Sequence, residues 1–200
     1  MKHYIVNLAF GITFLNLAIV GICNLNLTSS FMAMVQVCAI ACNTLMGVMI
    51  LFNTIASSSS SPLHNPHWLG MIACNIALVK LIDATHPLCG ALSLLFLVGF
   101  VIVIISVLSI GRSFAVTPVL SQIKTRHIYR MVRHPMYLGE ILMITACFLT
   151  SITIVSSIVM ALFIVFAVLR IREEEKLLLK SDSYKQYCIT TPWRIIPHLW

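Results

Sequence analysis

The chain alternates long apolar runs with short polar breaks, and this pattern predicts a protein built from membrane helices. The first apolar runs fall near residues 4–26, 31–55, 67–85 and 88–110. Each is long enough for a helix to cross a hydrocarbon core about 30 Å thick. Asparagine, serine and proline are frequent in the breaks, as expected for turns. We therefore expect four membrane spans in this part of the chain.

A fifth apolar run, from Ile141 to Leu169, is too long for one crossing. Its 29 residues would form a helix roughly 43 Å long. Such a helix would place Arg133 and Arg170 on opposite faces of the membrane. A polar patch near the middle of the run allows a turn instead. The patch consists of Thr150, Ser151, Thr153, Ser156 and Ser157. We therefore predict a helical hairpin whose two ends return to one face.

Composition and charge agree with a membrane protein. Of the 200 residues, 60% are hydrophobic and only 10% are charged, and the mean hydropathy is +0.99, which argues against a water-soluble globule. The net charge of +7 comes mostly from the C-terminal half. If the N-terminus, the 56–66 loop and the polar segments after Ile110 lie on one side of the membrane, that side holds every lysine and arginine except Lys80. This asymmetry predicts a multi-pass protein with both termini in the cytosol, in an inner or endoplasmic-reticulum-type membrane, and no nucleic-acid partner.

Two further features have structural interpretations. Lys80 and Asp83 are three residues apart, so their side chains can form an ion pair near the outer end of the third span. The seven cysteines lie mostly inside apolar runs and form no CxxC pair or Cys/His cluster with zinc-like spacing. We therefore expect no metal site.

The stretch RHPMYLGE, which begins at Arg133, is unusually polar for the entrance to an apolar helix. Pro135 fits the first turn of that helix and favours an extended His134. The free N–H groups at the helix start, with Arg133 and His134 beside them, suit an anion such as a carboxylate. Tyr137 and Tyr129 offer aromatic faces to a cation or a purine. An interfacial anchor is the alternative explanation for each residue taken singly.

A second polar cluster, RIREEEKLL, follows the predicted hairpin. Topology does not explain its carboxylates, which are unfavourable beside anionic lipid. Arg170 and Glu174 are four residues apart and share a helix face that continues the inner stripe of the hairpin, although an ordinary surface ion pair would explain this pair alone. Gly139 leaves room for a ligand or a neighbouring helix. Together the two clusters predict a cytosolic pocket where a soluble charged cofactor meets a lipid-borne substrate.

These residues carry a resemblance to a known family. The segment GRSFAVTPVLSQIKTRHIYRMVRHPMYLGE, with RIREEEKLL about thirty residues later and then YKQY and WRIIP, resembles the isoprenylcysteine carboxyl methyltransferase family and the wider group that includes phospholipid methyltransferases. We accordingly expect an all-α integral membrane protein of about six membrane helices, four spans plus a C-terminal hairpin. Residues 1–110 would form the four-span region, and residues 111–200 the catalytic region with its cytosolic cofactor pocket.

The resemblance also implies a reaction and a set of site residues. The cofactor would be S-adenosyl-L-methionine, and the methyl acceptor would be the carboxylate of a lipophilic, isoprenylcysteine-like substrate within the membrane. Arg170 and Glu174 would be catalytic, with Arg170 holding the substrate carboxylate and Glu174 also binding the cofactor. The other implied cofactor-binding residues are Ser121, Gln122, Ile123, Lys124, Tyr129, Arg133, His134, Pro135, Met136 and Tyr137. A carboxylate is already ionised at neutral pH, so such a reaction needs no strong general base.

Other functions remain open at this point. Phospholipid amine N-methyltransferases also combine membrane spans with cytosolic cofactor motifs. Sterol reductases, which use a nicotinamide cofactor, carry a similar RHPNYLGE-like segment. A non-enzymatic transporter or scaffold is the fourth interpretation, and under it Lys80, Asp83 and the serine-rich loop would matter most.

Overall fold

The structure is a computed structural model that describes residues 2–23, 25, 30–56, 67–83, 89–110 and 127–200. Every regular element in these ranges is a helix, which confirms the predicted all-α fold. The elements are α1 (Lys2–Cys23), α2 (Ser30–Ala56), α3 (His67–Lys80), α4 (Cys89–Ile110), the short 3-10 helix η2 (His127–Arg130), α5 (Pro135–Leu149), α6 (Ile154–Leu178) and α7 (Asp182–Thr190).

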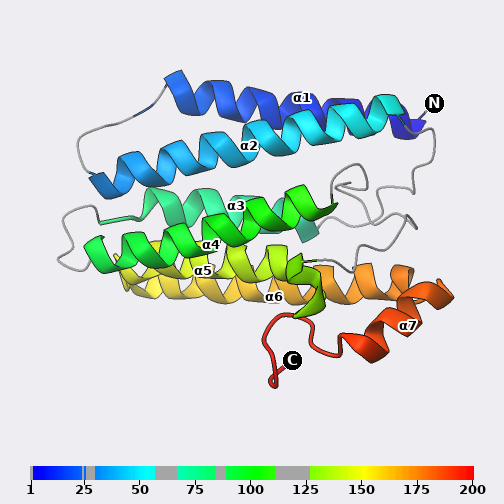
Figure 1. Ribbon diagram of the computed structural model, residues 1–200. Helices are drawn as coiled ribbons and strands as arrows, with labels where there is room; N and C mark the ends of the chain where they lie inside the picture. The colour runs from blue at the N-terminus through cyan, green and yellow to red at the C-terminus, as the bar shows by residue number, and fades with distance from the viewer. Residues whose placement is uncertain (1, 24, 26–29, 57–66, 84–88, 111–126) are drawn as a thin grey trace.

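Helices α1 to α6 run in alternately opposite directions through the bundle (Figure 1). Helices α1 and α2 pack against each other as a pair, and α2 joins this pair to α4. Helices α3, α5 and α6 pack together, and α5 also lies along α4. The start of α5 and the end of α6 lie at the same end of the bundle, which we call the motif end (Figure 1). Lys80 ends α3 at the opposite end.

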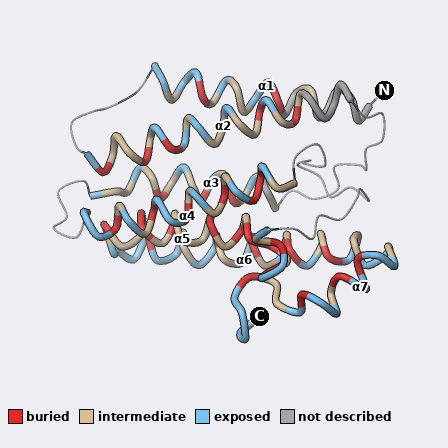
Figure 2. Tube along the Cα trace, viewed as in Figure 1, coloured by how far each residue is buried: buried red, intermediate tan, exposed pale blue. Residues whose placement is uncertain are grey.

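Three helices in the described ranges are long and apolar enough to cross a membrane: Ser30–Leu51, Gly90–Ile110 and Ile154–Leu178. Gly11–Cys23, Leu69–Lys80 and Pro135–Leu149 are shorter apolar helices. The long helices α4 and α6 carry exposed apolar side chains, among them Leu94, Leu108 and Ile154 at 67%, 58% and 81% exposure (Figure 2). Apolar side chains on the outside of a helical bundle are the expected surface toward lipid.

The third apolar segment is shorter than the predicted span 67–85. Helix α3 ends at Lys80, where the amide of Leu81 donates to the Leu78 carbonyl at 3.0 Å and the amide of Ile82 donates to the Val79 carbonyl at 3.4 Å. Bonds to carbonyls three residues back tighten a last turn and close the helix. The proposed ion pair between the side chains of Lys80 and Asp83 stays a prediction.

The predicted hairpin is confirmed, and its turn contains the polar patch. Helix α5 ends at Leu149, and the Thr150 hydroxyl donates to the Cys147 carbonyl at 2.7 Å. Thr153 then caps α6: its hydroxyl accepts from the Ser156 amide at 3.1 Å, and the Ser156 hydroxyl accepts from the Thr153 amide at 2.8 Å. This reciprocal pairing satisfies two amides that a helix start otherwise leaves without partners.

Helix α5 uses one face for α6 and the other for α4. Tyr137 and Ile144 belong to the core shared with α3 and α6. On the other face, a Cβ atom added to Gly139 would lie 2.6 Å from the carbonyl oxygen of Gly99. The glycine pair therefore lets the backbones of α4 and α5 approach closely, as small residues do between membrane helices. The space predicted beside Gly139 is filled by a neighbouring helix.

We expect Gly139→Ala to lower the free energy of unfolding by about 1–3 kcal/mol, as overpacking does elsewhere. The new methyl group would meet a backbone oxygen, which cannot rotate away, and Val103 Cγ2 at 2.7 Å. Denaturant titration in detergent micelles measures the change. Gly90→Ala is the matched control, because a Cβ atom there meets nothing within 4 Å. Equal stability of the two variants would contradict the close approach.

Candidate functional site

The start of α5 is organised by the C-terminal part of the chain. Helix α5 begins at Pro135, as predicted, and has no side-chain cap. The amide of Arg133 donates to the Trp193 carbonyl at 2.9 Å, and the amide of His134 donates to the Arg194 carbonyl at 2.8 Å. His134 has φ −127° and ψ 58°, so it is less extended than expected from the following proline. Its amide and that of Arg133 already have acceptors and do not add to an anion site.

The two polar clusters meet through the hydroxyl group of Tyr137. This hydroxyl accepts a hydrogen bond from Arg170 Nε at 2.6 Å and donates to Glu174 Oε2 at 3.0 Å. Tyr137 is 3% exposed. Glu140, one turn along α5, interacts electrostatically with both Arg170 and Glu174. The structure therefore confirms that the ends of the hairpin come together, with one guanidinium and one carboxylate hydrogen-bonded to a buried phenol.

Glu175 is at the centre of a second group of buried polar side chains, which we call the Glu175 cluster. The sequence interpretation did not single this residue out. Its Oε1 lies 3.2 Å from His134 Nε2 and 3.3 Å from Arg133 Nη2, and its Oε2 accepts from Arg194 Nε at 2.6 Å. The Glu175 side chain is only 4% exposed. A signal for it exists in the sequence, because the buried residues Phe163, Ala167 and Ile171 follow a spacing of four that next reaches residue 175.

Tyr129 and Tyr187 connect η2 to α7. The Tyr187 hydroxyl donates to the Tyr129 carbonyl at 2.5 Å, and burial raises the pKa of Tyr187 to about 12, so this phenol stays a donor at neutral pH. Burial also raises the pKa of Tyr129, and the negative charge of Glu174 adds to the increase. The charge of Glu174 thus links the Tyr129 phenol electrostatically to the group of Tyr137, Arg170 and Glu174, which we call the Tyr137 cluster.

The predicted site residues divide into three groups. Six belong to the contacts around Tyr137 and Glu175 or interact with them electrostatically: Tyr129, Arg133, His134, Tyr137, Arg170 and Glu174. Pro135 is buried at the helix start, and Met136 packs against the apolar core of Ile50, Val103 and Val107. Ser121, Gln122, Ile123 and Lys124 lie outside the described residues.

The clusters have the chemistry needed for a charged, polar cofactor. Among the described residues, Arg133 Nε and the Tyr184 hydroxyl are buried and have no hydrogen-bond partner. Arg133 pairs with Glu175, and Tyr184 interacts electrostatically with the same carboxylate. Buried donors without partners are uncommon and suggest that another polar group completes the site. Carboxylates beside aromatic rings suit a cation such as a sulfonium. These residues therefore fit S-adenosyl-L-methionine.

Comparison with known families covers the same region. The family model described as phospholipid methyltransferase matches residues 88–185, and no curated protein matches the chain. The matched range includes α4, η2, α5, α6 and the start of α7, and so contains the Tyr137 cluster and Glu175 but not Arg194. The resemblance to membrane methyltransferases is thus confirmed at the level of the superfamily. Within residues 88–185 the chain is similar to the phospholipid methyltransferase family of membrane methyltransferases.

Proposed function

We propose that this protein is an S-adenosyl-L-methionine-dependent methyltransferase that methylates the carboxylate of a lipophilic molecule at the motif end of the bundle. The observation that carries the proposal is the Tyr137 hydroxyl, which joins Arg170 to Glu174. A cationic group for an anionic acceptor and an anionic group for a cationic methyl donor are thereby held side by side by one buried side chain.

The cofactor side of the site consists of Glu174 and the rings around it. When bound, S-adenosyl-L-methionine would supply a methyl group on a positively charged sulfur. Glu174 stabilises positive charge through its carboxylate, and Tyr129 and Tyr137 add aromatic faces nearby. The hydrogen bond from Tyr137 orients this carboxylate before any ligand arrives. Such preorganisation contributes to transfer reactions by alignment.

The acceptor side consists of Arg170. A guanidinium presents its N–H donors in a planar fork that matches a carboxylate, and the bond from Nε to Tyr137 fixes that plane. Arg170 lies in the helix Ile154–Leu178, which is apolar enough to cross a membrane. A lipophilic acceptor in the membrane would therefore approach along the apolar part of α6 and meet Arg170 with its polar end.

A second candidate acceptor is the amine of a phospholipid. Two observations favour it: the matching family is described as phospholipid methyltransferase, and Glu140 lies near Arg170 and Glu174. A second carboxyl group beside Arg170 and Glu174 adds oxygen acceptors to the cluster. Such acceptors suit an ammonium headgroup.

Labelled S-adenosyl-L-methionine distinguishes these acceptors when it is incubated with membranes that contain the protein. For a carboxylate acceptor we expect label in the lipid-soluble fraction and its release as methanol by mild base, because a methyl ester is base-labile. For an amine acceptor the label stays on the lipid headgroup after base treatment. Membranes with Glu174→Gln are the control for labelling by other enzymes. No transfer of label by the wild-type protein would contradict both candidates.

A further inference from the structure

The C-terminal segment, residues 191–200, folds back against the start of α5 below the bundle (Figure 1). Besides the two carbonyls that accept from Arg133 and His134, the segment has internal bonds: the amides of Arg194 and Ile195 donate to the Trp200 carbonyl at 2.9 and 3.1 Å. The Arg194 guanidinium also lies 5.2 Å from the centre of the Trp200 ring. The segment is therefore an ordered loop that lies directly against the RHP motif.

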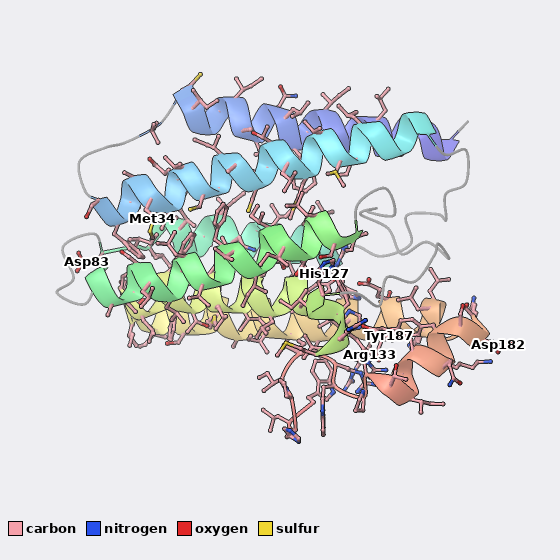
Figure 3. The ribbon with its side chains drawn as sticks, viewed as in Figure 1. Met34, Asp83, His127, Arg133, Asp182 and Tyr187 are labelled. Atoms are coloured by element: carbon pink, nitrogen blue, oxygen red, sulfur yellow. The ribbon has the colours of Figure 1, made fainter. Side chains whose placement is uncertain are left out.

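Glu175 ties this loop to the motif. One carboxylate oxygen contacts His134 and Arg133, and the other accepts from Arg194 in the C-terminal segment. Figure 3 shows Arg133 and Tyr187 close together at the motif end, where these groups converge. A carboxylate that is 4% exposed is strongly destabilising unless it is paired and hydrogen-bonded. Its three partners supply that compensation, and losing any of them affects the others.

This cluster differs from an ordinary ion pair in two respects. The pair of Lys185 with Asp182 has side chains 57% and 94% exposed, so water screens it and it contributes little. The Glu175 cluster is buried, and around it Arg133 Nε and the Tyr184 hydroxyl lack partners within the described part of the chain. A purely structural cluster would be expected to satisfy its own donors. The unsatisfied donors indicate that the cluster prepares a binding surface.

The contact with Glu175 also determines how His134 presents its ring. A carboxylate accepts hydrogen bonds, so the neighbour of Glu175 Oε1 carries the proton, and this assigns a proton to His134 Nε2. A carboxylate that orients a histidine in this way is familiar as a support for histidine ligands in metal sites.

We propose that Glu175 is a positioning residue for the cofactor site, an inference that rests on the function proposed above. Glu175 holds the His134 ring with Nε2 toward the carboxylate and also holds the Arg133 guanidinium, whose Nε is left to donate to an acceptor group of the cofactor, such as its carboxylate. Through Arg194 it also clamps the C-terminal segment against the start of α5. Cofactor binding and the order of the C-terminal segment are therefore coupled through one side chain.

The test compares Glu175→Gln with the wild-type protein in detergent micelles. The substitution keeps the size of the side chain and removes its charge. We expect the dissociation constants of S-adenosyl-L-methionine and S-adenosylhomocysteine to rise together by about tenfold or more, while the KM of the methyl acceptor changes less than about twofold. Hydrogen exchange at the amides of Arg133 and His134 should accelerate about tenfold, because their acceptors lie in the released segment.

Glu173→Gln is the matched control, with the same chemical change at a neighbouring side chain that is 42% exposed. If Glu175→Gln does not fold, Arg194→Gln releases the C-terminal segment while leaving Glu175 its other two partners, and the same exchange measurement applies. Unchanged hydrogen exchange at Arg133 and His134 together with unchanged cofactor affinity would overturn the proposal. An equal rise in the cofactor dissociation constant and in the KM of the methyl acceptor would also overturn it. If the wild-type protein binds neither nucleoside, the proposed function and the role of Arg133 fail together, while exchange still reports separately on the clamp.

Discussion

Arg170→Ala is expected to lower kcat/KM for a carboxylate acceptor by about 100- to 1000-fold, the usual effect of removing a group that stabilises a charged reactant in a closed site. Arg170 is the guanidinium of the Tyr137 cluster, and its Nε bond to Tyr137 fixes its orientation. Without it, the acceptor carboxylate loses its counter-charge and its alignment with the methyl group. Steady-state kinetics with the acceptor identified by labelling measures the loss.

Arg172→Ala is the matched control for this experiment, because Arg172 is exposed on the same helix two residues away. Arg170→Lys separates charge from geometry: lysine keeps the positive charge but not the planar fork, so we expect it to restore only part of the activity. If Arg170→Ala retains full turnover while Glu174→Gln abolishes it, the carboxylate acceptor is wrong and the phospholipid amine is supported.

The hairpin illustrates what local sequence chemistry can predict. A run longer than a membrane is thick and a patch of serine and threonine near its middle were sufficient to place the turn. The prediction succeeded because the turn uses only nearby groups, with Thr153 and Ser156 pairing across three residues. Once the turn exists, the chain itself brings Tyr137 to Arg170 and Glu174. Helix starts with such caps are among the features most easily predicted from a sequence.

Glu175 shows what local sequence patterns do not predict. Three glutamates are consecutive, and the spacing of buried residues along α6 favours position 175 as the buried one, but no local pattern supplies partners for its charge. Glu173 is half-exposed, and Glu175 is almost completely buried. The difference depends on the C-terminal segment, whose Arg194 pairs with Glu175 from 19 residues away. Nothing in the spacing of the two motifs indicates that this segment returns to the RHP motif. A long-range partner decided which carboxylate became the centre of the cluster.

Glu174→Gln is expected to raise the dissociation constant of S-adenosyl-L-methionine by about ten- to a hundredfold, which corresponds to about 1.4–2.8 kcal/mol. Glutamine keeps an oxygen that can accept from the Tyr137 hydroxyl, now 3.0 Å from Glu174 Oε2, so the local hydrogen bond can be retained. What is lost is a negative charge next to a positively charged sulfur, in a site where screening by water is weak. Equilibrium binding in micelles measures the effect.

S-adenosylhomocysteine provides the internal control, because it has the same adenosine and amino-acid parts but an uncharged sulfur. If Glu174 acts through charge, its replacement should weaken binding of S-adenosyl-L-methionine far more than binding of S-adenosylhomocysteine. This outcome differs from the parallel loss expected for Glu175→Gln, so the two neighbouring carboxylates can be told apart. Glu173→Gln should change neither affinity, since its side chain is 42% exposed and pairs with His67 instead. Equal weakening of both ligands by Glu174→Gln would mean that Glu174 supports the shape of the site and does not stabilise the sulfonium.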